Sequence, residues 1–444
     1  MVGGGTLESA VFERNMTASI SAERRVRLRK VAWATFSVVF FSLPVASLID
    51  NKLSPPTDYE VELGRIDREM SGLREAAFAA PVDSEKAARL AYLLFHRAVL
   101  TASAADLAAA EGALEKAFEQ TSAFADLYLL KANLDFKLHR LAETQRDLKA
   151  LSPFAGNAQI IAMTAGVALQ EGRYAAAQRG YQSAIAKNPT WDNLARLAYW
   201  EAKFGDPDRA DSLYQAAEEE ISAKEMRSYA WVELQRGLLD LQRGRYAAAL
   251  AHYRQAGKAY SGYWLVDEHM AELLGAQGKS HEAVALYEKV IARAPRPELQ
   301  QALGDLYLFM GKPDQAKPWH DTALAGYLES AGRGEVRYYH HLAGFYADVR
   351  QDGAEAVKWA RKDVELRPNF AMQGGLAWAL YRAGRFPEAL NLMRVALSSG
   401  VKDAHLFFQA AMIHIAAGQT DQGKELLQRA AAINPRFEDF HVHR

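Results

Sequence analysis

Small and apolar residues recur at helical spacing over most of this 444-residue chain, whereas the alternation typical of strands is hard to find. The clearest example is the run 158–169 (AQIIAMTAGVAL), and Gly172 stands three residues after its end. Glycine ends such a helix well because it adopts left-handed backbone angles without a Cβ clash. A second helix, predicted over 174–187, carries small residues and one aromatic on a single side, namely Ala177, Tyr181 and Ala184. The alanines let the two helices approach closely, and the tyrosine fills the space beside them.

This two-helix unit recurs along the chain. Its glycine returns at intervals of 33, 39, 34, 33, 73 and 34 residues, at Gly172, Gly205, Gly244, Gly278, Gly311, Gly384 and Gly418. The interval of 73 spans two units, one of which carries extra residues. A fixed period in this range predicts a repeat array, in which each unit buries its apolar face only against its neighbours.

The unit resembles the tetratricopeptide repeat. The first copy matches at Ala165, Gly172, Tyr174, Ala177, Tyr181, Ala184 and Pro189. Single units depart from the pattern, with Pro207 at the first aromatic position, Ser261 where proline is usual, and Gly423 in place of alanine. The resemblance implies an all-α, right-handed α-solenoid of about eight units over residues 158–437, with helices of roughly 11–15 residues. Residues 81–157 lack the clean repeat residues and are interpreted as degenerate helical hairpins or a cap.

The N-terminal region predicts a membrane association. Residues 31–49 form a 19-residue stretch without charge, preceded by a basic cluster at 24–30. Such a stretch can just cross a hydrocarbon layer of about 30 Å, and the basic side should remain in the cytoplasm. The segment is a transmembrane anchor, the apolar part of a cleaved signal peptide, or a buried helix, and the anchor is favoured. Residues 1–30 are predicted to be a disordered basic tail.

Two further segments flank the array. Residues 50–80 are predicted to be a linker followed by an amphipathic helix, which packs on the array or pairs with a second copy of itself. Residues 438–444 form a C-terminal tail with His441 and His443, two histidines that are weak evidence for a metal site.

Composition and motifs narrow the classes of function that the chain can have. The net charge of −1 argues against a nucleic-acid-binding protein. The chain has no cysteine, which excludes disulfides, thiolate nucleophiles and the cysteine-linked lipid of bacterial lipoproteins. No nucleotide-binding loop or hydrolase motif is found. The sequence thus predicts no cofactor, no metal and no enzymatic activity.

The concave face is the candidate binding surface, because the family binds partners through the first helix of each unit. Carried over unit by unit, the positions that line it are Trp231, Tyr338, His341, Phe345, Trp378, Tyr381, His405 and Phe408. Glu268 and Glu272 add an acidic step, which favours an extended peptide with apolar and basic side chains. The competing interpretation is that some of these rings fill the inside of a tight superhelix.

These features together predict a non-catalytic scaffold in a bacterial inner membrane, anchored or exported, with its solenoid on the periplasmic side. It would bind a protein or peptide partner in envelope assembly, secretion or cytochrome maturation. The alternative is a metal-handling or enzymatic protein that uses the solenoid as a frame.

Overall fold

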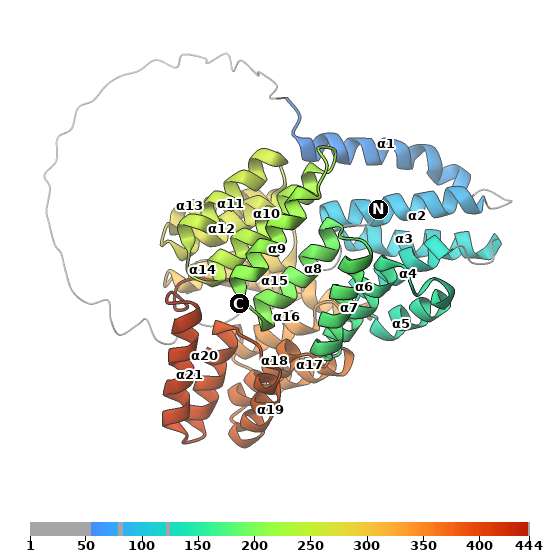
Figure 1. Ribbon diagram of the computed structural model, residues 1–444. Coiled ribbons are helices and arrows are strands. Elements are labelled where there is room, and N and C mark those ends of the chain that lie inside the picture. The colour runs from blue at the N-terminus through green and yellow to red at the C-terminus, as the bar shows by residue number, and fades with distance from the viewer. Residues whose placement is uncertain (1–54, 79–82, 121–124, 443–444) are drawn as a thin grey trace, which may run out of the picture.

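A computed structural model describes residues 55–78, 83–120 and 125–442, and every regular element within them is helical (Figure 1). The α-helices are α1 (Asp58–Phe78), α2 (Ser84–Thr101), α3 (Ala104–Gln120), α4 (Ala125–Lys137), α5 (Leu141–Ala150), α6 (Ala158–Gln170), α7 (Tyr174–Lys187), α8 (Trp191–Phe204), α9 (Pro207–Glu219), α10 (Met226–Gln242), α11 (Tyr246–Ala259), α12 (Trp264–Ala276), α13 (Ser280–Arg293), α14 (Pro297–Phe309), α15 (Pro313–Gly332), α16 (Tyr339–Gly344), α17 (Gly353–Leu366), α18 (Phe370–Arg382), α19 (Phe386–Ser398), α20 (Ala404–Ala416) and α21 (Thr420–Ile433). A 3-10 turn, η2 (Ser152–Phe154), and a π-helical turn, η3 (Phe345–Val349), complete the set.

The segments predicted at 1–30 and 31–49 lie outside the described residues. Among the helices that the structure describes, none combines the length and the apolar character needed to cross a bilayer.

Successive helices pack as hairpins, from α2 with α3 to α20 with α21. In the hairpin of α6 and α7, Ala177, Tyr181 and Ala184 are all buried, as the spacing of small and aromatic residues predicts. Gly172 has the left-handed φ of 75° that ends the first helix. The prediction of an all-α array of paired helices is therefore confirmed for the described residues, with eight hairpins between α6 and α21.

The predicted helix length of about 11–15 residues is wrong for α2 with 18 residues, for α3 and α10 with 17 each, and for α5 with 10. The largest departures occur at the 73-residue interval. Helix α15 has 20 residues, and α16 has only six before it continues as the π-helical turn η3. The extension of α15 is held by buried contacts, since Tyr327 donates a hydrogen bond to Gln301 Oε1 over 2.9 Å. The extra residues of this interval thus lengthen a second helix and interrupt the first helix that follows.

The first helices close onto the middle of the chain. In α1, Ile66 and Met70 are buried, and Asp58 Oδ2 accepts a hydrogen bond from the Ser261 amide over 2.9 Å. The Trp264 indole nitrogen donates to the Leu100 carbonyl over 3.0 Å. Helix α1 therefore packs on the array, and α1–α3 share one apolar core with α10–α14.

A second closure joins α6–α8 to α17–α20, and Figure 1 shows α6 and α7 beside α17 and α18. The Lys203 ammonium lies 2.8 Å from the Asp403 carboxylate, and both side chains are buried. The Tyr174 hydroxyl accepts a hydrogen bond from the Phe370 amide over 2.6 Å. Units that are about 200 residues apart thus lie against each other, and the solenoid is tightly wound.

Candidate functional site

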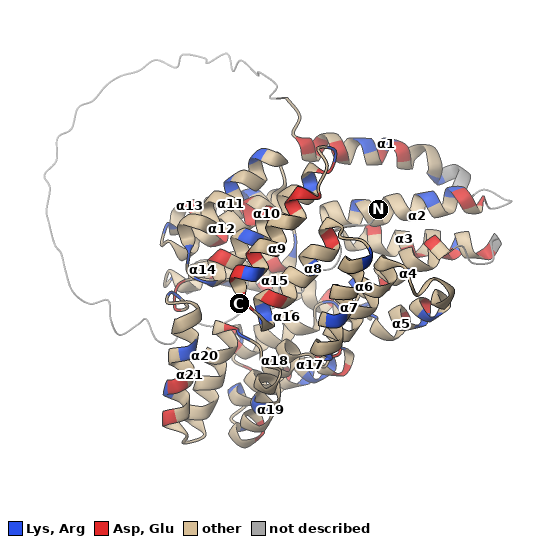
Figure 2. Cartoon of the chain, viewed as in Figure 1, with Lys and Arg blue, Asp and Glu red and all other residues tan. Residues whose placement is uncertain are grey.

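A cavity of about 50 Å³ lies where α2 and the end of α4 meet the beginnings of α14 and α16. We call it the cationic pocket, after its polar lining of Lys137, His139, Arg296, Glu298, Arg337, His340 and His341. Three of these side chains carry a permanent positive charge, and one carries a negative charge. Figure 2 shows acidic and basic positions interspersed along the helices of the described residues, without a long run of one charge in this view.

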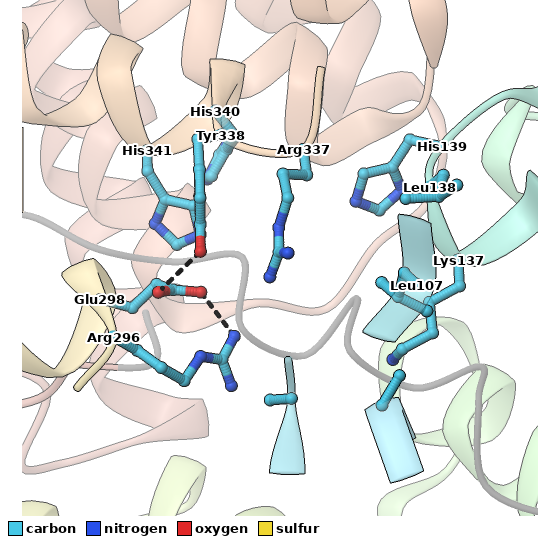
Figure 3. A pocket seen from close by; sticks show the side chains of 12 residues that line it. Leu107, Lys137, Leu138, His139, Arg296, Glu298, Arg337, Tyr338, His340 and His341 are labelled. Carbon is cyan, nitrogen blue, oxygen red and sulfur yellow. Dashed lines mark hydrogen bonds and ion pairs between the residues drawn. The ribbon is translucent and has the colours of Figure 1, made fainter. Parts of the chain in front are cut away.

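One wall of the pocket holds an internal carboxylate. Glu298 lies in the first turn of α14, where Arg296 donates to its Oε1 over 2.6 Å. Tyr338 directly precedes α16, and its hydroxyl donates a hydrogen bond to Glu298 Oε2 over 3.2 Å (Figure 3). Burial raises the pKa of Glu298, but the positive charges of Arg296, His341 and Arg337 outweigh it and bring that pKa to about 2. This wall shows that the pocket's cations hold a carboxylate in its ionised form.

The opposite wall comes from the N-terminal hairpins. Lys137 ends α4, and His139 follows in the turn to α5 with a left-handed φ of 62°. In Figure 3, Arg337 extends into the space between these two residues and Glu298. The pocket is therefore assembled by the closure of the solenoid and not by a single repeat.

A buried ion pair supports the wall behind His139. Arg367 Nη1 lies 3.1 Å from His139 Nδ1, and its Nη2 donates to Asp363 Oδ1 over 2.6 Å. Burial raises the pKa of Asp363, but Arg367 and His340 outweigh it and bring that pKa to about 2. Asp363 stays ionised at neutral pH and holds Arg367 against the imidazole.

A second cavity, of about 40 Å³, continues from the first through the shared residue His340. We call it the apolar pocket, because Phe370, Met372, Trp378 and Leu406 line it together with several alanines. Its polar lining includes His405 and Gln409, whose side-chain nitrogens lie 2.8 Å apart. The two pockets share His340 in their linings, and one is lined by charged side chains where the other is mainly apolar.

Four of the eight predicted site residues line these two pockets. Tyr338 and His341 lie in the cationic pocket, and Trp378 and His405 lie in the apolar pocket. Trp378 is only 3% exposed and donates its indole hydrogen to Asp348 over 3.0 Å. The structure therefore places these four residues in two neighbouring pockets, although Trp378 offers little area to a partner.

The other four lie elsewhere. Phe345 is 0% exposed, so tight winding places it in the core and not on an accessible face. Half-buried Tyr381 stacks on Trp378 with ring centroids 4.7 Å apart, and half-buried Phe408 faces Phe437 at 5.8 Å. Trp231 packs against Trp191 at 6.0 Å, in a separate cluster.

The acidic step predicted at Glu268 and Glu272 is not an open surface. Both carboxylates are buried, and Glu272 accepts a hydrogen bond from the Val442 amide over 2.6 Å. At Glu272 the chain's own C-terminal segment lies where the sequence led us to expect a partner.

Sequence reasoning does not find Lys137, His139, Arg296, Arg337 or His340 as site residues. The repeat positions identify the concave face within one unit, whereas these side chains meet across units far apart in the chain. The available signal is that Arg296 stands directly before the first helix α14, and Arg337 stands two residues before the first helix α16. Within the described residues, no group of three or more His, Asp or Glu is placed to hold a metal ion.

Family models of the tetratricopeptide repeat match residues 371–401 and residues 269–296. The first range covers nearly all of the hairpin of α18 with α19, and the second covers the latter part of α12 and all of α13. The chain contains tetratricopeptide repeats. A curated relative, the TPR repeat-containing protein YpiA of Bacillus subtilis, is 24% identical over 204 residues, which are 45% of this chain and 39% of YpiA. The chain therefore spans well under half of that relative.

Solved structures are similar to the chain over longer ranges. Yeast Tom70 covers 84% of this chain and 89% of its own, with 16% identity and a TM-score of 0.37. A human IFIT1 dimer with PPP-AAAA covers 85% of this chain and 95% of its own, with 14% identity and a TM-score of 0.42.

Proposed function

We propose that this tetratricopeptide-repeat protein is a non-catalytic scaffold that binds an acidic segment of a partner protein in the cationic pocket. The observation that carries the proposal is the lining of that pocket, where Lys137, Arg296 and Arg337 face a single carboxylate. Hydrogen bonds between charged partners are the strong ones, and low local dielectric strengthens them further.

The partners of Glu298 support the proposal that the pocket recognises a carboxylate of the ligand. The pocket already pairs this carboxylate with Arg296 and Tyr338, over 2.6 and 3.2 Å. Arg337, beside it, extends into the space between Glu298 and the opposite wall of Lys137 and His139 (Figure 3). A second carboxylate placed between Arg337 and Lys137 would meet the same kind of donors.

The apolar pocket supports the proposal that the ligand is a protein segment. It adjoins the cationic pocket through His340 and is lined by Phe370, Met372 and Leu406. A segment with an acidic residue near an apolar one would match the two pockets. Other peptide-binding grooves also gain specificity from neighbouring pockets that each bind one side chain. Nucleic acid would instead need a basic stripe that continues along the groove.

The proposal assigns no catalytic step and no cofactor. A general acid or base works best with a pKa near the working pH. The pKa of Glu298, at about 2, leaves it ionised and weakly basic at neutral pH. Its suitable role is to hold Arg296 in place.

We also propose that residues 31–49 tether the solenoid to a bacterial inner membrane, with the array outside the cytoplasm. The support is the uncharged stretch and the basic cluster before it. A reporter enzyme that is active only in the periplasm, fused after residue 444, should be active. Activity of a cytoplasmic reporter alone would refute this orientation.

Site-specific photo-cross-linking tests the scaffold proposal. A photoreactive amino acid at Leu138, which lines the cationic pocket, should cross-link to a protein segment in which Asp or Glu lies within a few residues of the attachment. The control is the same amino acid at Leu328, an exposed position on α15. Cross-links from Leu138 that map only to nucleic acid, to lipid or to segments without acidic residues would contradict the proposal.

A further inference from the structure

After α21 the chain returns to helices that precede it by about 170 residues. Phe440 and Val442 are 2% and 1% exposed, and both belong to the core shared with α12 and α14. Residues 439–442 have no helical structure and lie against the first helix of the repeat α12–α13. This C-terminal segment covers the concave positions of that repeat.

The segment is held by contacts typical of a bound peptide. The Val442 amide donates to Glu272 Oε1 over 2.6 Å, and the Tyr246 hydroxyl donates to Asp439 Oδ2 over 2.9 Å. The His441 Nδ1 lies 4.0 Å from the same Glu272 oxygen. One main-chain hydrogen bond and one ionisable pair thus fix the register of the segment.

A glycine provides the seat for Phe440. A Cβ at Gly275 would lie 2.5 Å from Phe440 Cδ1, closer than any side chain tolerates. On the other side, the Phe440 ring stands 5.7 Å from the ring of Phe309, between centroids. Gly275 on α12 and Phe309 on α14 therefore form a socket that fits an aromatic side chain.

We propose that this surface of α11, α12 and α14 is a second binding site, for an extended partner segment with a basic side chain between two apolar ones. Phe440, His441 and Val442 are such a segment, and they occupy the site in cis. Glu272 is fully buried on the concave face. Its carboxylate accepts a hydrogen bond from the main-chain amide of the segment and would pair with the basic side chain of the ligand. None of these residues lines the cationic pocket, so the two sites are separate.

Because the chain's own segment occupies the site, an external partner must displace it in order to bind. A tethered segment acts at an effective concentration on the order of millimolar, so a partner must compete with it. The apparent affinity for a partner is the intrinsic affinity multiplied by the fraction of molecules whose site is open. Weakening the chain's own segment should therefore strengthen the binding of an external one.

The test uses a fluorescein-labelled peptide with the sequence of residues 435–442 (PRFEDFHV). The full chain carrying Phe440→Gly and Val442→Gly should bind it saturably in fluorescence anisotropy, at least tenfold more tightly than the wild-type chain. Val442→Gly alone, which is the milder change, should give a smaller gain. Adding Gly275→Leu to the double variant should abolish binding, because the leucine fills the socket.

Melting curves followed by circular dichroism confirm that each variant is folded. No saturable binding by either folded tail variant, or equal binding by the wild-type chain, would overturn the proposal. So would a wild-type dimer in size-exclusion chromatography that dissociates on Phe440→Gly and Val442→Gly, because the segment would then occupy a second copy.

Discussion

Three residues other than glycine hold a left-handed backbone in the described part of the chain. Ala102, His139 and Gln351 have φ values of 56°, 62° and 54°. His139 and Gln351 stand between the two helices of their hairpins, where the clean units have glycine. Glycine marks this boundary in the sequence, so units that lack it are hard to place. That is why the pocket wall at Lys137 and His139 is not predicted.

Gln351→Gly should stabilise the fold slightly. Left-handed backbone costs a residue with a Cβ roughly 1–2 kcal/mol, and the more flexible unfolded chain offsets about 0.4–1 kcal/mol of the gain. We expect a net gain of about 0.5–1 kcal/mol in unfolding experiments. The matched control, Gly384→Ala at φ 73° with no neighbour near its Cβ, should lose stability. The same sign for both variants would contradict the strain argument.

Glu298 should contribute to stability in an acid-sensitive way. Its pKa falls from an ordinary 4.5 to about 2 in the folded chain, so its contribution is full above about pH 4.5 and is lost as pH falls toward 2. The full contribution is ~3 kcal/mol. Glu298→Gln should therefore be less stable than wild type at neutral pH, by an amount that shrinks between pH 4.5 and 2. A pH-independent difference in denaturant unfolding would show that the charge is not responsible.

At the scale of the element, the spacing of small and apolar residues predicts the paired helices well. It fails between α15 and α17, where inserted residues lengthen one helix and leave α16 with six residues before η3. Periodicity reports which side of a helix is buried, but not how an insertion is absorbed. Here α15 is lengthened by the insertion, and Tyr327 and Ser330 are buried and hydrogen-bonded, to Gln301 and Glu335.

Ala177→Trp tests the register of the α6–α7 hairpin. Ala177 is fully buried where the two helices touch, so a large ring must push them apart. We expect a loss of about 3 kcal/mol, at the upper end of typical overpacking, seen as a lower melting temperature. Ala175→Trp, on the exposed side of the same helix, is the control and should change stability little. Equal melting temperatures for the two variants would disprove the register.

At the scale of the whole molecule, the winding is the feature that the sequence does not reveal. Each hairpin is rotated slightly relative to the last, and small rotations accumulate along an array. Their sum decides whether Lys203 meets Asp403, 200 residues later, and whether Arg337 faces Lys137. The fold class and the hairpins are thus predictable from the repeat, whereas the cationic pocket is not.

Lys203→Met should loosen this winding. It removes the ammonium that lies 2.8 Å from the buried Asp403 carboxylate, at a cost of about 3–5 kcal/mol. Small-angle scattering should show a larger radius of gyration, and the melting temperature should fall. Lys424→Met, which removes one partner of the exposed pair with Asp421, is the control and should change neither quantity. An unchanged radius for Lys203→Met would argue that other contacts hold the closure.

The most direct test of the central claim is the affinity of a short labelled peptide of Asp, Glu and Leu for three forms of the full chain. Wild type should bind it, and Glu298→Gln should bind it several-fold more tightly, because a negative charge leaves the pocket. Arg337→Glu should weaken binding at least tenfold, since a charged hydrogen bond contributes about 1.5–3 kcal/mol. A Lys and Leu peptide of equal length is the control and should not bind. Equal affinity of the acidic peptide for all three forms would contradict the account.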